Sequence, residues 1–413
     1  MTQRTAGPRP GRREVAALGL LLAGLLCNGY VLQIPSFAGP SLVADWQVDR
    51  AALSPVFSAT LLGIVAGAAL FGWAGDRWGR RRMVLIATAW QAATVLACAW
   101  ASDPGQLTLL RLLCGIGLGG AVPNSVALAQ ELSHGPWQLR FSAVVLLGLP
   151  GGSALPAPVA AWLLPVTGWP SMFVLGAMVT TLVVLAMLRW LPESTAYLAS
   201  RRAAGTSAAA PAAGSGWAAL FRGPLAFTTP CLWLMMAGSM MALHVLTSWL
   251  PLLLADVGVL PADAAGMTGA VHLGGTLATL ASIGLLGRFG LGWVALLFGC
   301  GAAGILLAAL GDFSTTLLWP AVLLAGFGIV GSQGALGTLA AQRYPSSCRP
   351  TGVGLAIAVG RLGAVVGPLL GGAMHAAGFS TRGLFSLSLW PISVGLACTG
   401  LLALVESARR QAP

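Results

Sequence analysis

Twelve apolar runs occupy most of this 413-residue chain, and they constrain its fold more than any other feature. Each run is about 20 residues or slightly longer, enough to cross ~30 Å of hydrocarbon at about 1.5 Å per residue of helix. Because lipid offers the backbone no hydrogen-bond partners, spans of this length must be helices. We therefore predict an all-α integral membrane protein with helices over 15–37, 53–74, 83–101, 107–131, 141–164, 170–190, 226–253, 265–287, 291–310, 316–341, 351–374 and 382–405.

Composition supports a membrane protein. Hydrophobic residues make up 57% of the chain and charged residues only 8%, whereas an average soluble domain is about 25% charged. A soluble domain could not hide this much apolar surface, but lipid accepts it. The 56 Gly and 25 Pro residues also suit membrane helices, where small side chains allow close packing and neighbours re-satisfy an interrupted backbone.

The charge pattern gives an orientation and excludes several function classes. The net charge is +11, but the arginines are spread between the apolar runs, so we expect no nucleic-acid surface. If the N-terminus is cytoplasmic, eighteen arginines fall on that side and only Arg50 and Arg382 on the other. This matches the positive-inside rule, and twelve spans then put both termini in the cytoplasm. We find no nucleophile–base pair, metal-ligand spacing or phosphate loop, so we expect neither an enzyme nor a metal or cofactor site.

The chain divides into two halves that repeat. Its one long break between apolar runs is basic and rich in Ala, Gly and Ser, as flexible linkers are. We predict a six-helix bundle over 1–191, a cytoplasmic linker over 192–225 and a second bundle over 226–413. Residues 112–117 (LLCGIG) return 211 positions later as 323–328 (LLAGFG). Such repeats are typical of transporters that rock around a site between the halves, near the membrane midplane.

The most specific motif follows the second apolar run. It consists of Gly72, Asp76, Arg77, Gly79, Arg80 and Arg81. Gly72 would permit close helix approach, and Asp76 could accept hydrogen bonds from a helix N-terminus or an arginine. The arginines would hold the loop at anionic lipid. A basic stop signal would explain the arginines but not the spaced Gly and Asp, so we interpret the motif as a conformational latch.

This motif resembles the signature loop of the major facilitator superfamily, and Arg111-x-x-x-Gly115-x-Gly117-x-Gly119 resembles its fourth-helix motif. Further segments resemble the aromatic acid:proton symporter family within it, most closely the 3-(3-hydroxyphenyl)propionate transporters. These segments are 55–59, 117–124, 189–194, 248–251 and 344–368. The resemblance covers nearly the whole chain.

The resemblance implies a major facilitator fold, with twelve transmembrane helices in two pseudo-symmetric six-helix bundles. It implies a monomeric secondary active transporter of the bacterial inner membrane that works by alternating access. The expected substrate is a small organic anion, an aromatic carboxylate of the hydroxyphenylpropionate, hydroxybenzoate or benzoate type, imported with a proton as a possible second partner.

Three other functions stay open on the sequence. One is a drug or metabolite exporter of the same fold; exporters often carry a Gly-Pro motif on the fifth helix. Here 148–152 read GLPGG with different spacing, and a similar motif at 367–372 lies on the eleventh helix, as in the importers. A second is an uncoupled organic-anion uniporter or exchanger. The third is a membrane sensor, which would be expected to carry a soluble output domain.

One departure from the resembled family concerns the proton. The family carries acidic residues on its first helix in the pattern acid-Gly-hydrophobic-Asp, whereas 28–31 here read NGYV. All eleven Asp and Glu residues fall in loops or near predicted helix ends. The usual carboxylate proton carrier is therefore missing, and the second half has also lost the aspartate of its own latch motif (Gly287).

Two arginines lie inside predicted spans. Arg361 falls near the middle of its span, where a charge costs about 2.5–3.5 kcal/mol on insertion scales and is usually functional. Its guanidinium could grip a carboxylate or bond backbone carbonyls. Arg111 lies nearer the outer end, where snorkelling or helix packing competes with a transport role. Glu131 and Arg140 flank the next loop, as either a cytoplasmic gate or a solvated pair.

Histidines, amides and aromatic residues complete the candidate site. His244 and His272 titrate near neutral pH and are the proton-coupling candidates, or else buried neutral rings. Tyr30 and Trp249 could stack on an aromatic substrate, and Trp249 could instead anchor a helix at the membrane interface. The remaining polar groups in the spans could line a cavity or join helices. They are Asn28, Gln33, Asn124, Ser248 and Gln333.

Overall fold

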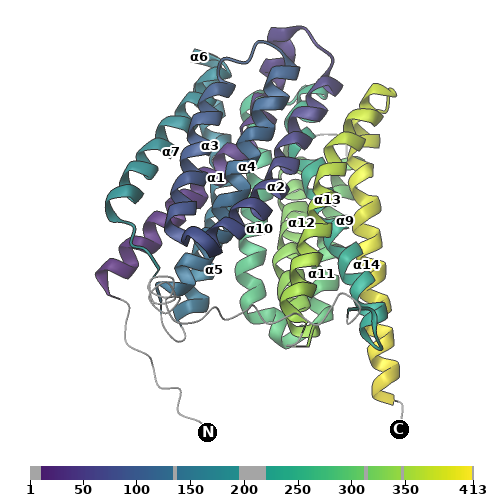
Figure 1. Cartoon of the computed structure of the whole chain (residues 1–413). Coiled ribbons are helices and arrows are strands. Elements are labelled where there is room, and N and C mark those ends of the chain that lie inside the picture. The colour runs from purple at the N-terminus through teal and green to yellow at the C-terminus, as the bar shows by residue number, and fades with distance from the viewer. Residues whose placement is uncertain (1–10, 134–136, 195–219, 311–314, 346–347, 412–413) are drawn as a thin grey trace. The chain divides into compact units, whose positions relative to one another are not determined.

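A computed structural model describes residues 11–133, 137–194, 220–310, 315–345 and 348–411, and the regular structure within these ranges is entirely helical (Figure 1). The prediction of an all-α protein is therefore confirmed. Most of the predicted linker, residues 195–219, lies outside the described residues.

The helices follow one another in a simple order along the chain. The first half contains α1 (Arg12–Trp46), η1 (Arg50–Leu53), α2 (Ser54–Trp78), α3 (Arg80–Cys98), α4 (Pro104–Glu131), α5 (Trp137–Ala154), α6 (Pro156–Thr167) and α7 (Pro170–Trp190). The second half contains α9 (Leu225–Asp256), α10 (Pro261–Phe289), α11 (Leu291–Leu310), α12 (Thr315–Arg343), α13 (Arg349–Ala376) and α14 (Thr381–Gln411).

Each predicted span coincides with helix in the structure. Among the described residues, ten helical stretches are long and apolar enough to cross a membrane. The span predicted over 141–164 is divided between α5 and α6, because Pro156 has no backbone N–H with which to continue the helix. The first helix runs to Trp46, beyond the predicted end at residue 37, although it contains Pro35 and Pro40.

The helices form two compact units. Unit 1 comprises Met1–Ser41 and Ala59–Ala209, and unit 2 comprises Leu42–Ser58 and Ala210–Pro413. The connection between α1 and α2 therefore belongs to unit 2, although it lies in the first half of the sequence. The predicted boundaries of the two six-helix bundles, at residues 191 and 226, stay a prediction.

Glycines let helices in both units approach until their backbones touch. A Cβ added to Gly63 of α2 would overlap the Leu112 carbonyl of α4. In unit 2, a Cβ added to Gly274 of α10 would overlap the Leu323 carbonyl of α12. Gly274 and Leu323 lie 211 positions after Gly63 and Leu112, which is the offset of the sequence repeat. The repeat thus specifies the same close helix contact in each unit, with helix backbones packed as small residues permit.

Candidate functional site

Arg111 joins three helices inside unit 1. Its side chain is fully buried, and Nε donates a hydrogen bond to Thr60 Oγ1 of α2 at 3.0 Å. Nη1 donates to the Val31 carbonyl at 3.1 Å and Nη2 donates to the Leu32 carbonyl at 3.2 Å, both on α1. The guanidinium is therefore satisfied by protein groups, which favours helix packing over substrate contact.

A proline explains why α1 offers carbonyl oxygens to Arg111. In a regular helix the Val31 carbonyl would accept from the backbone N–H four residues later. That residue is Pro35, which has no N–H. The freed oxygen needs another donor in the absence of water, and Arg111 supplies it.

Two asparagines make further helix contacts within unit 1. Asn28 of α1 donates from Nδ2 to the Leu118 carbonyl of α4 at 3.0 Å. Asn124 of α4 donates from Nδ2 to the carbonyls of Phe71 and Gly120, each at 2.9 Å. Both side chains are buried, as is that of Gln33. These contacts give Asn28 and Asn124 a role in joining helices.

The latch motif forms the tight turn between α2 and α3. Gly79 has φ of 102°, a backbone conformation that residues with a Cβ rarely adopt. Arg80 Nε lies 3.6 Å from Glu131 Oε1, so the motif is paired with the end of α4. Arg81 donates from Nε to the Leu191 carbonyl at 2.5 Å, which neutralises the partly negative end of α7.

The remaining residues predicted for the latch are Gly72, Arg77 and Asp76, and the structure describes them as follows. The close approach predicted at Gly72 lies at Gly75 instead, where a Cβ would overlap Asn124 Oδ1; a Cβ at Gly72 would meet nothing within 4 Å. Arg77 is exposed and stacks over Trp73 at 5.8 Å. The backbone of Asp76 lies in α2, but its side chain is outside what the structure describes.

The predicted partnership of Glu131 and Arg140 is replaced by another. Glu131 pairs with Arg80, whereas the Arg140 guanidinium lies over the Trp137 ring, 4.9 Å from its centroid. Both Arg140 and Trp137 lie in the first turn of α5, so this stack is local. Glu131 therefore belongs with the latch.

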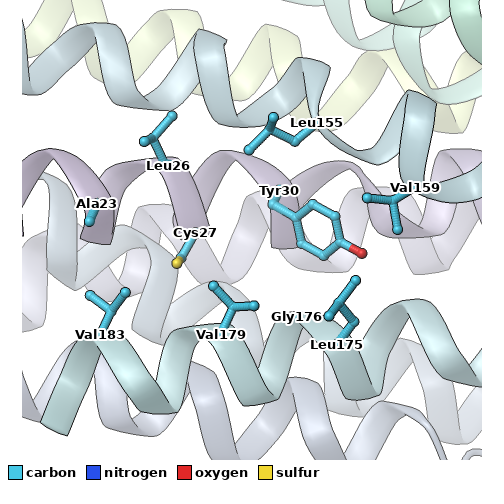
Figure 2. Close-up of a pocket in the computed structure, with 10 residues that line it drawn as sticks. All are labelled: Ala23, Leu26, Cys27, Tyr30, Leu155, Val159, Leu175, Gly176, Val179 and Val183. Carbon is cyan, nitrogen blue, oxygen red and sulfur yellow. The ribbon is translucent and has the colours of Figure 1, made fainter. Parts of the chain in front are cut away.

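Tyr30 lines a cavity of about 320 Å³ within unit 1 (Figure 2). The hydroxyl of Tyr30 donates to the Met172 carbonyl of α7 at 3.2 Å. Figure 2 shows its ring and Cys27, both from α1, facing side chains of α7. The rest of the lining is apolar, so this cavity offers a carboxylate no free donor. Tyr30 lies on the side of α1 opposite Asn28, because residues two apart in a helix are about 200° apart.

Arg361 and His244 form the polar centre of unit 2. Arg361 of α13 is half-buried, and no described residue makes a hydrogen bond or ion pair with its guanidinium. His244 of α9 lies one turn beyond Met240, whose side chain adjoins Gly360, the residue before Arg361. His244 Nδ1 lies 2.8 Å from the Met240 carbonyl. Because a carbonyl only accepts, Nδ1 carries the proton and Nε2 keeps its lone pair.

Other candidates of unit 2 surround this centre or lie apart from it. Ser248 is one turn beyond His244 on the same face of α9. His272 of α10 is buried and interacts electrostatically with His244. Gln333 lies on α12, and its buried Nε2 has no hydrogen-bond partner in the described part of the chain. Arg361, His244 and His272 therefore all belong to unit 2.

Trp249 lies in a separate contact of unit 2. Its ring is 1% exposed, packs edge-on against Phe57 with centroids 5.7 Å apart, and donates from Nε1 to the Pro368 carbonyl at 3.3 Å. Ser54 donates to the same carbonyl at 2.8 Å, and Arg50 forms an ion pair with Asp256. In this conformation Trp249 fastens the α1–α2 connection to α13.

Not every partner carries a signal in the sequence. Thr60, which accepts a hydrogen bond from Arg111, is an ordinary polar residue in the pattern. Glu193, which accepts from the backbone N–H of Arg81, lies in one of the segments that carry the family resemblance. Prolines within apolar runs are a usable signal, because each removes a backbone donor and frees a carbonyl for a distant side chain. Pro35 is an example.

Comparison with known proteins identifies similar sequences and similar folds. Residues 21–368 match the Major Facilitator Superfamily. The chain is similar to a gallate transporter of Pseudomonas putida, at 34% identity over 91% of this chain and 90% of the relative. It is also similar to a 3-(3-hydroxy-phenyl)propionate transporter of Escherichia coli (strain K12), at 35% identity over 96% of this chain and 95% of the relative. These relatives are named as transporters and not as enzymes.

Solved structures share the fold. The nucleoside transporter NupG superposes with a TM-score of 0.74, covering 94% of this chain and 99% of that protein at 16% identity. At this identity the match bears on the fold alone, and it confirms the predicted twelve-helix architecture.

Proposed function

The chain belongs to the major facilitator superfamily of multi-pass membrane transporters, and we propose that it carries a small aromatic carboxylate. Gallate and 3-(3-hydroxy-phenyl)propionate, named for its relatives, define the substrate class. Import across the bacterial inner membrane by alternating access, as a monomer with both termini in the cytoplasm, is part of the proposal.

Arg361 is the observation that carries this proposal. Its guanidinium is half-buried in a membrane-spanning helix without a partner among the described residues, whereas Arg111 is fully bonded. A charged group in a span needs an opposite charge or hydrogen bonds. A substrate carboxylate supplies both, and the planar fork of arginine matches it in bidentate geometry.

The side chains next to Arg361 suit the aromatic ring of the proposed substrate. A Cβ added to Gly360 would lie 3.1 Å from Met240 Sδ and 2.6 Å from Met236 Cγ. Two thioether side chains thus adjoin the residue before Arg361. Methionine adapts to irregular ligands and contacts aromatic rings favourably, so we place the substrate ring against α9 near Met240, with Ser248 and Gln333 as candidates for ring hydroxyl groups.

Proton coupling, if it accompanies the substrate, runs through His244. The Nε2 atom of this ring is the position that would gain a proton, since Nδ1 is held by the Met240 carbonyl. A carboxylate bound at Arg361 would stabilise the imidazolium, and substrate and proton would then promote each other's binding. His272, which interacts with His244, is the second candidate.

Uptake of labelled 3-(3-hydroxyphenyl)propionate, gallate, 4-hydroxybenzoate and benzoate by a transport-deficient bacterium tests the proposed function. Cells expressing the protein should accumulate at least one of these acids above empty-vector cells. A neutral aromatic amide of the same shape is the matched control, because it lacks the charge that Arg361 would bind. Equal handling of the acid and the amide would contradict the proposal.

A further inference from the structure

We infer that this carrier exchanges one aromatic anion for another much faster than it delivers anions into an empty compartment. The inference rests on the proposed function, because it concerns the same site at Arg361. It follows from the charge of that site with and without substrate, and from the positions of the acidic residues.

Every acidic residue in the described part of the chain lies at or near the end of a helix, or in a loop. In chain order the acidic residues of the whole sequence are Glu14, Asp45, Asp49, Asp76, Asp103, Glu131, Glu193, Asp256, Asp263, Asp312 and Glu406. Asp312 lies outside the described residues, between α11 and α12. The sequence therefore provides no acidic side chain within the central turns of any helix.

Arg361 lies far from both ends of its own helix. Twelve residues separate it from Arg349, the first residue of α13, and fifteen from Ala376, the last. At about 1.5 Å per residue these separations are ~18 and ~22 Å along the axis. A carboxylate at either end of α13 would therefore lie about half a helix length away. His244 lies one turn beyond Met240, whose side chain adjoins Gly360, the residue before Arg361. A histidine is neutral or positive and never negative.

With His244 neutral, the empty and loaded carriers consequently differ by one full charge in the membrane. With an aromatic carboxylate bound, the anion neutralises the guanidinium, and the loaded site can close with its charge compensated. Without substrate, closing the site excludes water from an unpaired cation, which is unfavourable in a low-dielectric environment. The empty carrier should therefore reorient slowly. Exchange bypasses this step, because the carrier crosses the membrane loaded in both directions.

Counterflow in proteoliposomes tests this inference. Purified protein is reconstituted at pH 7.5, where the acids are ionised, and uptake of labelled 3-(3-hydroxyphenyl)propionate is followed. One set of vesicles contains the same acid, unlabelled and at saturating concentration, and the other contains only a bulky sulfonate buffer. We expect initial uptake into the preloaded vesicles to be at least tenfold faster. Equal rates would overturn the inference.

Two substitutions at one position isolate the charge. His244→Glu places a carboxylate beside Arg361, so the empty site becomes internally paired, whereas His244→Gln has a similar size and no charge. We expect the ratio of preloaded to empty uptake to fall toward one in His244→Glu and to stay high in His244→Gln, whatever their absolute rates. Because the ratio is taken within each variant, it is independent of expression and of the active fraction.

The outcomes separate the two proposals. A high ratio in the wild type and in His244→Gln, but not in His244→Glu, supports exchange set by the charge of Arg361. If the initial uptake rates with and without preloading are equal, the protein still transports aromatic acids, but the exchange inference is wrong. Absence of carboxylate-specific uptake under both conditions removes the proposed function, and the inference with it.

Discussion

Arg361 and Arg111 both lie within membrane-spanning helices, and their surroundings indicate different roles. Arg111 is buried and bonded to α1 and α2, so its charge is used inside the protein. Arg361 has no such partners in the described chain, so its charge is available to a ligand. The residue type is the same, and the neighbours differ.

Substitution of Arg361 should weaken substrate binding more than it affects insertion. Hydrogen bonds to charged groups contribute about 1.5–3 kcal/mol, which corresponds to about tenfold to a hundredfold in affinity. We expect Arg361→Lys, which keeps the charge but loses the fork, to raise KM about tenfold, and Arg361→Gln to raise it more. Arg288→Gln, at an exposed arginine of α10, is the control. Tight binding of aromatic acids by Arg361→Gln would show that the carboxylate binds elsewhere.

The contact between Arg111 and α1 should show energetic coupling with Pro35. Arg111→Gln leaves the Val31 carbonyl without its donor, which should lower the free energy of unfolding by ~1–3 kcal/mol. Pro35→Ala restores a backbone N–H for the same carbonyl, so Arg111→Gln should cost less in that background. Thermal unfolding in detergent of the two single variants and the double variant gives the coupling energy, expected at about 0.5–3 kcal/mol. Strictly additive effects would mean that Pro35 does not create the acceptor.

At the scale of elements, the turn between α2 and α3 joins three helix ends in unit 1. Arg80 reaches Glu131 at the end of α4, and Arg81 reaches the last turn of α7 through the Leu188 and Leu191 carbonyls. Gly79 makes the turn possible with its positive φ. The arrangement can act as a latch because these bonds join the turn between α2 and α3 to the ends of α4 and α7.

The latch predicts unequal effects of neighbouring arginines. Arg80→Ala removes the ion pair with Glu131, and Asp76→Asn removes the negative charge of the motif. Each substitution should reduce transport several-fold while membrane insertion is retained. Arg82→Ala is the matched control, since Arg82 is exposed and also carries one positive charge. Transport rates and the amount of protein in the membrane are measured together. Wild-type rates in both Arg80→Ala and Asp76→Asn would remove the latch assignment.

The sequence predicts the elements of this protein better than their contacts. Length and apolarity determine the spans, and the 211-residue repeat anticipates that Gly63 and Gly274 make equivalent contacts. Side-chain direction is set by how helices cross, which a single sequence does not encode directly. The position of Tyr30 and the packing of Trp249 against Phe57 are therefore visible only in the structure. The same holds for the proximity of His244 and Arg361.

At the scale of the whole molecule, the lost acids of the first helix leave proton movement to a histidine. If transport is proton-coupled, substrate added outside empty proteoliposomes drives proton uptake in the wild type, because a bound carboxylate stabilises the imidazolium of His244. His244→Gln cannot take a proton and should abolish this signal while still binding substrate through Arg361. Exchange between loaded vesicles and medium should move no net protons in either protein, since each inward crossing is matched by an outward one.

The internal pH of the vesicles, reported by a trapped fluorescent dye, measures this movement, and a protonophore gives the baseline. Proton uptake that persists in His244→Gln would move the assignment to His272, which interacts with His244 in unit 2. A wild-type protein that takes up substrate without protons would be an anion uniporter or exchanger. Its direction would then follow the substrate gradient and the membrane potential, because a carrier with no titrating group cannot use a proton gradient to accumulate an anion.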